Sequence, residues 1–282
     1  MHRSGTSVVT RSLECLGVNL GDRLIEAASD NPKGFFEDRD VLSINQRALR
    51  HVGSHWHRPP AFEHSGLSEL AEDALGRIAR RVVSEKARRL SPLAIKDPRL
   101  CILLPFWRPV LSTLDLDVSC VIVVRKPFSV AASLRRRNGL SADISLMLWL
   151  KYMLGAMTEL DASWTLAFTE FETLVSRPRA ELARLADTLG LKVNGARLED
   201  FALRFLDYHL YHENEVEGLH ANHNDLAGYM YKLLSDVASG AAILESATVA
   251  AFSACKRKCC DLIPGDGRDS VADLPWHLRT FS

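Results

Sequence analysis

The stretch VSCVIVV at residues 118–124 runs directly into Arg125-Lys126-Pro127-Phe128. An almost unbroken apolar run rich in β-branched residues is typical of a parallel strand that is buried on both faces. Pro127 suits the first turn of a helix, because proline lacks the N–H that a helix start leaves unpaired. The stretch therefore predicts a buried strand whose carboxyl end places Arg125 beside a helix start.

Shorter apolar segments on either side predict further strands at residues 93–95 and 165–168. Amphipathic or apolar segments between the strands predict helices, and Gly190 suits the end of the last one. These helices are expected at residues 7–16, 68–90, 141–160 and 179–189, followed from Glu199 onward by a helical cover. Strands that alternate with helices predict an α/β domain with a parallel sheet.

The composition is that of an ordinary globular chain of 282 residues, with 47% hydrophobic and 25% charged residues. The 35 Lys and Arg balance the 35 Asp and Glu, so no overall positive field exists to attract nucleic acid. No segment reaches the roughly 18 apolar residues of a membrane-spanning helix, and the first residues are too polar for a secretion signal. We therefore expect a cytoplasmic protein whose six scattered cysteines are buried thiols without disulfides.

The segment at residues 2–7, His-Arg-Ser-Gly-Thr-Ser, runs straight into an amphipathic helix. Backbone N–H groups of such a loop and of the first helical turn converge on one spot, which favours an anion. Gly5 lets the backbone approach a ligand, Thr6 and Ser7 add hydroxyl donors, and Arg3 adds a planar charged fork. An ordinary helix cap made by Ser or Thr explains this segment equally well.

The loop differs from the phosphate loop of ATP- and GTP-using enzymes, because Thr6 stands where that pattern requires Lys. This difference disfavours a kinase. It favours a nucleotide whose group transfer needs no magnesium ion.

At Arg3 to Ser7 the chain resembles the sulfotransferase superfamily, whose loop for the 5′-phosphosulfate reads Lys/Arg-Ser-Gly-Thr-Ser/Thr. These enzymes use 3′-phosphoadenosine 5′-phosphosulfate (PAPS) as the donor. Asn31 to Glu37 is similar to a motif of the bacterial branch, and the motif chemistry is similar to that of tyrosylprotein sulfotransferases. The resemblance covers approximately residues 2–215. It implies a P-loop-NTPase-like three-layer fold with a central parallel sheet, in one domain whose nucleotide-binding core spans 1–198 and whose mainly helical cover spans 199–282.

The family binds the 3′-phosphate with an Arg-x-Pro element and a Ser eight residues after the Arg, a spacing that Arg125 and Ser133 share. Arg137 matches a further basic contact of the tyrosylprotein branch. The alternative is that the arginines at 135–137 form a solvated basic face. We expect that role for Arg135 and Arg136. The resemblance thus assigns two sets of donor-binding residues, namely Arg3, Ser4, Gly5, Thr6 and Ser7 for the 5′ end, and Arg125, Ser133 and Arg137 for the 3′ end.

Lys96-Asp97-Pro98-Arg99 follows a predicted strand, and ligands of open α/β sheets bind at the carboxyl ends of strands. A similar Lys-Asp-Pro element in the tyrosylprotein branch supplies a Lys to the sulfuryl group, which implies that role for Lys96. Asp97 fits a helix cap better than a role in the site. Arg99 is a substrate contact or a structural one.

Glu37 closes the segment Gly-Phe-Phe-Glu at residues 34–37. Shielding by the two aromatic rings would make its carboxylate more basic, as a general base requires. The resemblance implies that Glu37 is the base, with Arg3 and Lys96 as the other catalytic residues. The alternative is a solvated surface acid beside Asp38 and Asp40.

Three further positions carry weaker signals. Phe171 stands where the family has a Tyr after a strand, so a core residue is expected there. His51, His55 and His57 approach the spacing of metal ligands, but no Cys or carboxylate completes a set, so no metal is expected. His209 and His212 lie in a segment similar to the family's variable substrate side, where packing is the favoured role.

In α/β nucleotide folds the phosphate loop follows a central strand, whereas this loop begins at residue 2. We therefore expect that a strand upstream of Met1 is missing from the chain as written. Its addition is expected to raise the stability and the affinity for PAPS.

Together these features predict an enzyme that transfers a sulfuryl group from PAPS to a hydroxyl or amine. We expect the acceptor to be a small molecule or a glycan. The sequence does not distinguish between these two, and it does not predict the oligomeric state. Two alternatives stand beside this hypothesis: a P-loop nucleotide kinase-like enzyme, and a nucleotide-binding homologue with impaired catalysis.

Overall fold

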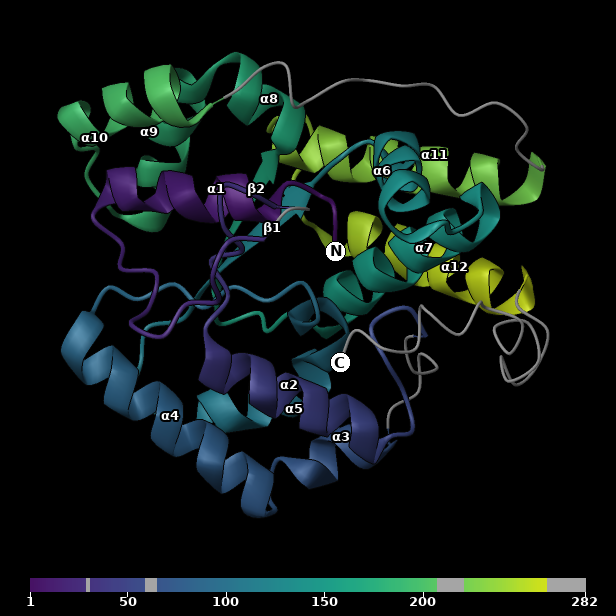
Figure 1. The fold of residues 1–282 in the computed structure, drawn as a ribbon. Helices are drawn as coiled ribbons and strands as arrows, with labels where there is room; N and C mark the ends of the chain where they lie inside the picture. The colour runs from purple at the N-terminus through teal and green to yellow at the C-terminus, as the bar shows by residue number, and fades with distance from the viewer. Residues whose placement is uncertain (29–30, 59–64, 207–220, 263–282) are drawn as a thin grey trace.

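The computed structural model of the chain describes residues 1–28, 31–58, 65–206 and 221–262 (Figure 1). Within these residues the sheet has two strands, β1 (Ser119–Val124) and β2 (Thr165–Glu170). The strands are parallel, with Ser119 opposite Thr165 and Val124 opposite Glu170. The two strongest predicted strands are therefore confirmed. His209 and His212 lie outside the described residues.

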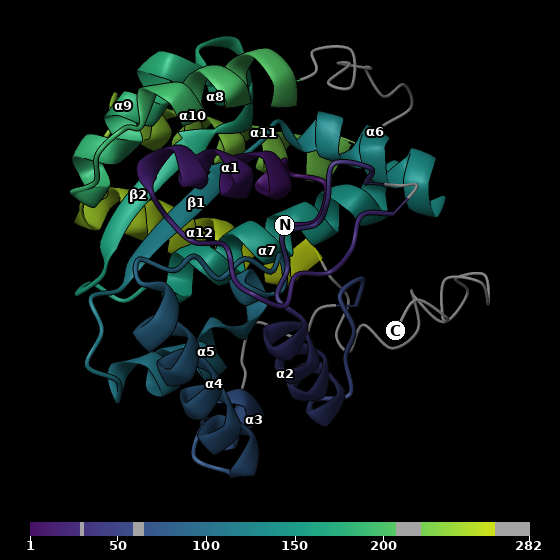
Figure 2. The same cartoon turned by 60° about the vertical axis from the view of Figure 1, so that its left-hand side comes forward.

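Both faces of β1 are covered, because successive side chains of a strand point to opposite sides. Val121 and Val123 pack against one hydrophobic cluster, and Ile122 and Val124 belong to another. The first cluster includes residues of α1 (Thr6–Leu13), α8 (Phe171–Ser176) and α9 (Pro178–Leu189). The second includes residues of α7 (Ala142–Glu159), α11 (Ala221–Ala238) and α12 (Ser246–Leu262). Figure 2 shows helices on both sides of the strands, so the fold is the predicted three-layer α/β arrangement with a helical C-terminal part.

A further group of helices packs beside these layers, below them in Figure 1. It comprises α2 (Arg39–His51), α3 (Ser65–Leu70), α4 (Ala74–Leu90) and α5 (Leu100–Ser112), and α5 packs on α7. The remaining elements are η1 (Glu14–Leu16), α6 (Pro127–Asn138), α10 (Gly195–Asp200) and the π-helical turn η2 (Phe201–Phe205). The core boundary at residue 198 and the strand upstream of Met1 stay predictions.

Two predicted elements are wrong. Residues 93–95 form no strand but a single parallel bridge between Asn19 and Leu93, because their pairing partner is a short loop rather than another strand. The long helix at 68–90 is two helices, α3 and α4, with a turn between them. Gly76 fits closely against this turn, since a Cβ there would lie 1.7 Å from the carbonyl oxygen of Ala71.

A buried ion cluster fixes the loop that leads to α2. Nζ of Lys86, on α4, lies 2.6 Å from Asp22 Oδ1, 2.8 Å from Asp38 Oδ2 and 3.2 Å from Asp40 Oδ2. Burial opposes the charge of Lys86, but the three carboxylates outweigh it and raise its pKa. Asp38 also caps α2 by accepting from the backbone N–H of Asp40. The cluster therefore fixes the backbone directly after Glu37.

Two further expectations concern membrane-spanning helices and the burial of the cysteines. Among the described residues, no helix combines the length and the apolar character needed to cross a bilayer. All six cysteines are free. Cys15, Cys255 and Cys259 are buried as expected, but Cys260 is exposed because it lies on the outer face of α12.

Candidate active site

The candidate anion-binding loop is a tight turn that leads into α1. Arg3 and Gly5 have left-handed backbone conformations, with φ of 64° and 77°. A Cβ on Gly5 would lie 2.0 Å from Cδ2 of Phe171, the first residue of α8. The Phe171 ring is buried in the cluster under α1, which confirms the expected core role and means that only glycine fits at position 5.

The structure brings the two predicted anion-binding segments into contact. Nε of Arg3 donates to Oγ of Ser133 at 2.8 Å, although the two residues are 130 positions apart. Nη1 of Arg125 donates to the carbonyl oxygen of Arg3 at 2.8 Å, and its guanidinium carbon lies 4.3 Å from the centroid of the Phe171 ring. The loop before α1 and the β1–α6 connection therefore form one site.

The other donor-binding candidates differ in exposure. Ser4 is fully buried, and its Oγ has no hydrogen-bond partner among the described residues. Thr6 is partly buried at the first position of α1. Oγ of Ser7 donates to the carbonyl oxygen of Phe35 at 3.2 Å. Arg137 is exposed in the last turn of α6, so it lies at the rim rather than in the interior.

A carboxylate that the sequence analysis did not assign lies beside Arg125. Oε1 of Glu172 accepts from the backbone N–H of Lys126 at 3.4 Å and lies 3.9 Å from Nε of Arg125. Burial raises the pKa of Glu172, although the charge of Arg125 opposes that shift. Its carboxylate therefore contacts both the side chain of Arg125 and the backbone that follows it.

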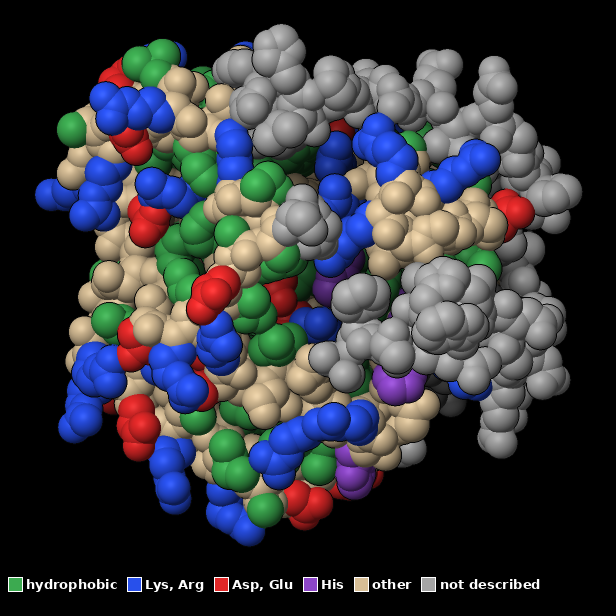
Figure 3. Space-filling view, in the orientation of Figure 1, with side chains coloured by type: hydrophobic (Ala, Val, Ile, Leu, Met, Phe, Trp, Pro, Cys, Tyr) green, Lys and Arg blue, Asp and Glu red, His purple; other side chains and the backbone are tan. Residues whose placement is uncertain are grey.

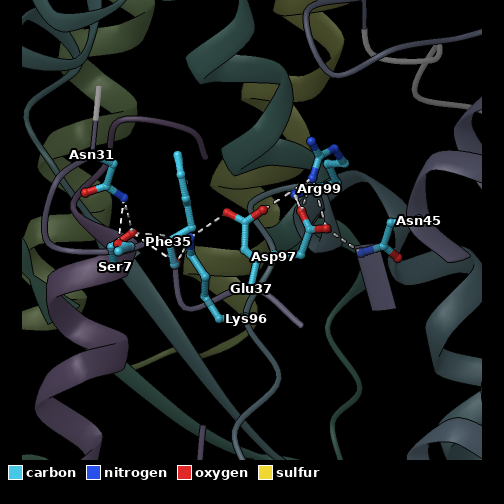
Figure 4. Close-up of polar contacts among 9 residues, drawn as sticks. Ser7, Asn31, Phe35, Glu37, Asn45, Lys96, Asp97 and Arg99 are labelled. Atoms are coloured by element: carbon cyan, nitrogen blue, oxygen red, sulfur yellow. Dashed lines mark hydrogen bonds and ion pairs between the residues drawn. The ribbon is translucent and has the colours of Figure 1, made fainter. Parts of the chain in front are cut away.

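Glu37 and Lys96 meet at the centre of the site (Figure 4). Nζ of Lys96 donates to Oε1 of Glu37 at 2.7 Å, to the carbonyl oxygen of Phe35 at 2.9 Å and to Oγ of Ser7 at 3.4 Å. Glu37 has only 8% of its side chain exposed, so the alternative of a solvated surface acid is wrong. The polar neighbours of its carboxylate are cations, with Nη1 of Arg99 at 3.6 Å from Oε2.

Asp97 has the expected capping contact and two more. Its Oδ1 accepts from the backbone N–H of Arg99 at 2.8 Å, just before α5. Both carboxylate oxygens lie 3.0 Å from Nη1 of Arg99, and Oδ2 accepts from Nδ2 of Asn45 at 2.8 Å. Asn45 was not predicted as part of the site, because it lies 52 positions from Asp97 in the chain.

His2 lies in the candidate anion-binding loop, and the sequence predicted no role for it. Its ring centroid lies 4.7 Å from that of Trp56 and 6.2 Å from that of Tyr152. Its Nε2 is sealed from solvent and has no hydrogen-bond partner in the part of the chain that the structure describes. Burial lowers the pKa of His2 well below its ordinary value, and the charge of Arg99 adds to this shift. The imidazole is therefore neutral at neutral pH.

This pKa shift predicts that acid weakens the fold. Between the low pKa of folded His2 and the unfolded value of about 6.5, only the unfolded chain binds the proton. The free energy of unfolding should therefore fall as the pH drops below about 6.5, by up to about 1.4 kcal/mol per pH unit. Urea unfolding of His2→Asn should show a flatter dependence on pH. His51→Asn, at an exposed position of α2, is the control; an equal slope in both variants contradicts the prediction.

Basic side chains collect around this site. On the face shown in Figure 3, Lys and Arg side chains lie beside a histidine near the centre, between the region of α1 and α6 and that of α2. No group of three or more His, Cys, Asp or Glu suited to a metal ion occurs in the described part of the chain. The site thus combines cations and hydroxyl groups with buried carboxylates, of which Glu37 lies between Lys96 and Arg99.

Comparisons with known proteins give one match. No family model matches the chain, and no curated protein matches it. Among solved structures, the chain is similar to a sulfotransferase domain from the curacin biosynthetic pathway, with 13% sequence identity and a TM-score of 0.44. The match covers 89% of this chain and 93% of that domain.

Proposed function

We propose that this protein is a sulfotransferase that moves a sulfuryl group from PAPS to a hydroxyl or amine of a small molecule or glycan. The observation that carries the proposal is the contact between the two anion-binding segments, made by Arg3 with Ser133 and by Arg125 with the Arg3 carbonyl group. PAPS carries anionic groups at the 5′ and 3′ positions of one ribose. Two adjacent sets of cationic and hydroxyl donors suit such a nucleotide.

The residues present fit this co-substrate. Gly5 presents bare backbone at the start of α1, and the buried hydroxyl of Ser4 still lacks a partner there. Arg3, Ser4, Gly5, Thr6 and Ser7 would hold the 5′-phosphosulfate, where helix N–H groups favour an anion. Arg125, Ser133 and Arg137 would hold the 3′-phosphate. PAPS supplies an activated sulfuryl group whose leaving oxygen becomes more negative during transfer.

Three side chains would then perform the chemistry. Glu37 accepts the proton of the acceptor hydroxyl or amine, since it is the buried carboxylate that contacts Lys96 beside the proposed donor loop. Lys96 and Arg3 stabilise the negative charge that grows on the oxygens around sulfur, as fixed cations do in phosphoryl transfer. In the structure Lys96 already contacts both the carboxylate of Glu37 and the hydroxyl of Ser7. It therefore lies between the proposed base and the proposed donor loop.

Nucleotide preference tests this proposal. At a concentration of 100 Kd a ligand adds about 2.7 kcal/mol of stability, which corresponds to a rise in Tm of about 5 °C for a chain of this size. We expect 3′-phosphoadenosine 5′-phosphate to produce that rise, and adenosine 5′-phosphate or ATP with magnesium to produce little. Arg125→Ala should abolish the shift, whereas Arg135→Ala, at an exposed position of the following helix α6, should keep it.

The alternatives give different outcomes in the same experiment. A larger shift with ATP and magnesium would favour a kinase-like enzyme. A shift with 3′-phosphoadenosine 5′-phosphate, but no transfer of labelled sulfate from PAPS to a panel of phenols, sugars and amines, would favour an impaired homologue. Absence of any nucleotide shift contradicts the proposed donor.

A further inference from the structure

A continuous polar chain runs from the site into the helical group below it. Nε1 of Trp107, on α5, donates to Oδ1 of Asn45, on α2, at 2.7 Å. Nδ2 of Asn45 donates to Asp97, Asp97 pairs with Arg99, and Arg99 reaches Glu37. Figure 4 shows this chain ending at the same carboxylate that Lys96 contacts from the other side.

The members of this chain are held firmly. Asn45, Asp97 and Trp107 are at most 5% exposed, and a buried polar group is costly unless its hydrogen bonds are made. Asp97 accepts from Asn45 with one oxygen and from the Arg99 backbone with the other. Rotation of its carboxylate would break one of these bonds. The position of Asp97 is therefore fixed from two helices, α2 and α5.

The two cations beside Glu37 differ in how they are fixed. Arg99 has a planar guanidinium bound to the buried carboxylate of Asp97, and Asp97 and Glu37 raise its pKa although burial opposes the charge. Lys96 has a compact ammonium group on a flexible stem, shared between Glu37, Phe35 and Ser7. An anion that reaches the loop at Ser7 can draw the ammonium group of Lys96 away from Glu37. It cannot draw Arg99 away in the same manner, because the guanidinium is bound to Asp97.

We propose that Asn45 and Asp97 are positioning residues that hold Arg99 against Glu37, so that the Glu37 carboxylate keeps its place when Lys96 turns toward an anion on the loop. The benefit of this role rests on the proposed function, in which Glu37 accepts a proton after the donor has bound. The positioning itself is a property of the protein without nucleotide. The two can therefore be tested separately.

The test is a ¹³C NMR measurement on protein labelled at the Glu carboxyl carbons, in which the Glu37 signal is assigned with Glu37→Gln. In the wild type this signal should stay a single narrow line when inorganic sulfate is added. In Asp97→Asn it should shift or split even without sulfate, because Arg99 loses its charged partner and is no longer held in one place against Glu37. Glu181→Gln, on α9, is the matched control, since it also replaces a buried carboxylate that is paired with an arginine. This variant should leave the Glu37 line unchanged.

A transfer assay with PAPS completes the test. We expect kcat of Asp97→Asn to fall at least tenfold while KM for PAPS stays within twofold, because the donor-binding segments are untouched. An unchanged Glu37 line in Asp97→Asn overturns the positioning role, whatever the activity. A wild type without transfer, together with a moved Glu37 line in Asp97→Asn, contradicts the proposed function and supports the positioning role. If Asp97→Asn does not fold, Trp107→Phe removes only the outermost donor, and an unchanged line in that variant overturns the positioning role.

Discussion

Replacement of Arg3 by alanine should lower the rate of sulfuryl transfer by about a hundredfold or more, the usual cost of removing one donor that stabilises transition-state charge. Arg3 lies on the turn before α1, and its Nε donates to Ser133 of the second anion-binding segment. Its loss removes a cation from the proposed phosphosulfate position and the side-chain contact with Ser133, one of the two contacts that join the segments. The side chain is only partly buried, so the chain should remain folded.

The measurement is kcat/KM with labelled PAPS, together with Tm as a check of folding. Arg3→Lys keeps the charge but loses the planar fork, so its activity should lie between those of the wild type and Arg3→Ala. Arg136→Ala, exposed on α6, should retain wild-type activity. Activity of Arg3→Ala above half of the wild-type value would exclude Arg3 from the catalytic set.

Replacement of Gly5 by alanine should destabilise the fold by about 2–5 kcal/mol, the sum of left-handed backbone strain and overpacking. The φ of 77° costs an alanine about 1–2 kcal/mol, and its Cβ would lie 2.0 Å from the Phe171 ring. Relief of that clash requires movement of the loop or of α8. Binding of 3′-phosphoadenosine 5′-phosphate should therefore be lost together with stability.

Gly139 provides a matched control for this prediction. It ends α6 with a φ of 68°, and nothing lies within 4 Å of the position of its Cβ. Gly139→Ala should therefore show the backbone strain alone, about 1–2 kcal/mol in urea unfolding, with nucleotide binding retained. Equal losses of stability in the two variants would mean that contact with Phe171 does not fix the loop.

Local patterns in the sequence predicted the sheet well. The apolar run before Arg125 and the shorter one before Phe171 became β1 and β2, and Gly190 ends α9 in a left-handed conformation as expected. These features depend on neighbours within a few residues, so one segment of sequence contains the whole signal. The proline after β1 likewise begins α6.

Patterns that depend on distant partners were predicted less well. Residues 93–95 have the composition of a strand but pair only with a loop. The helical periodicity of residues 68–90 continues across a turn at which Gly76 lies close to Ala71. For the site, the motifs that resemble those of the sulfotransferase superfamily pointed to Arg3, Ser133, Lys96 and Glu37. The surroundings of Glu37 were not predicted. Aromatic neighbours were expected, whereas the polar contacts of its carboxylate are two cations, Lys96 and Arg99.

The sequence by itself determined the two segments that we propose as anion-binding: a glycine-containing turn before a helix, and an arginine at the end of a buried strand. These follow from backbone geometry and side-chain chemistry over a few positions. Only the tertiary structure decided that the two segments touch, that Phe171 closes the space above Gly5, and that Asn45 and Asp97 stand behind Arg99. Such contacts join helices and loops far apart in the chain, and their geometry is set by the packing of whole layers rather than by any local pattern.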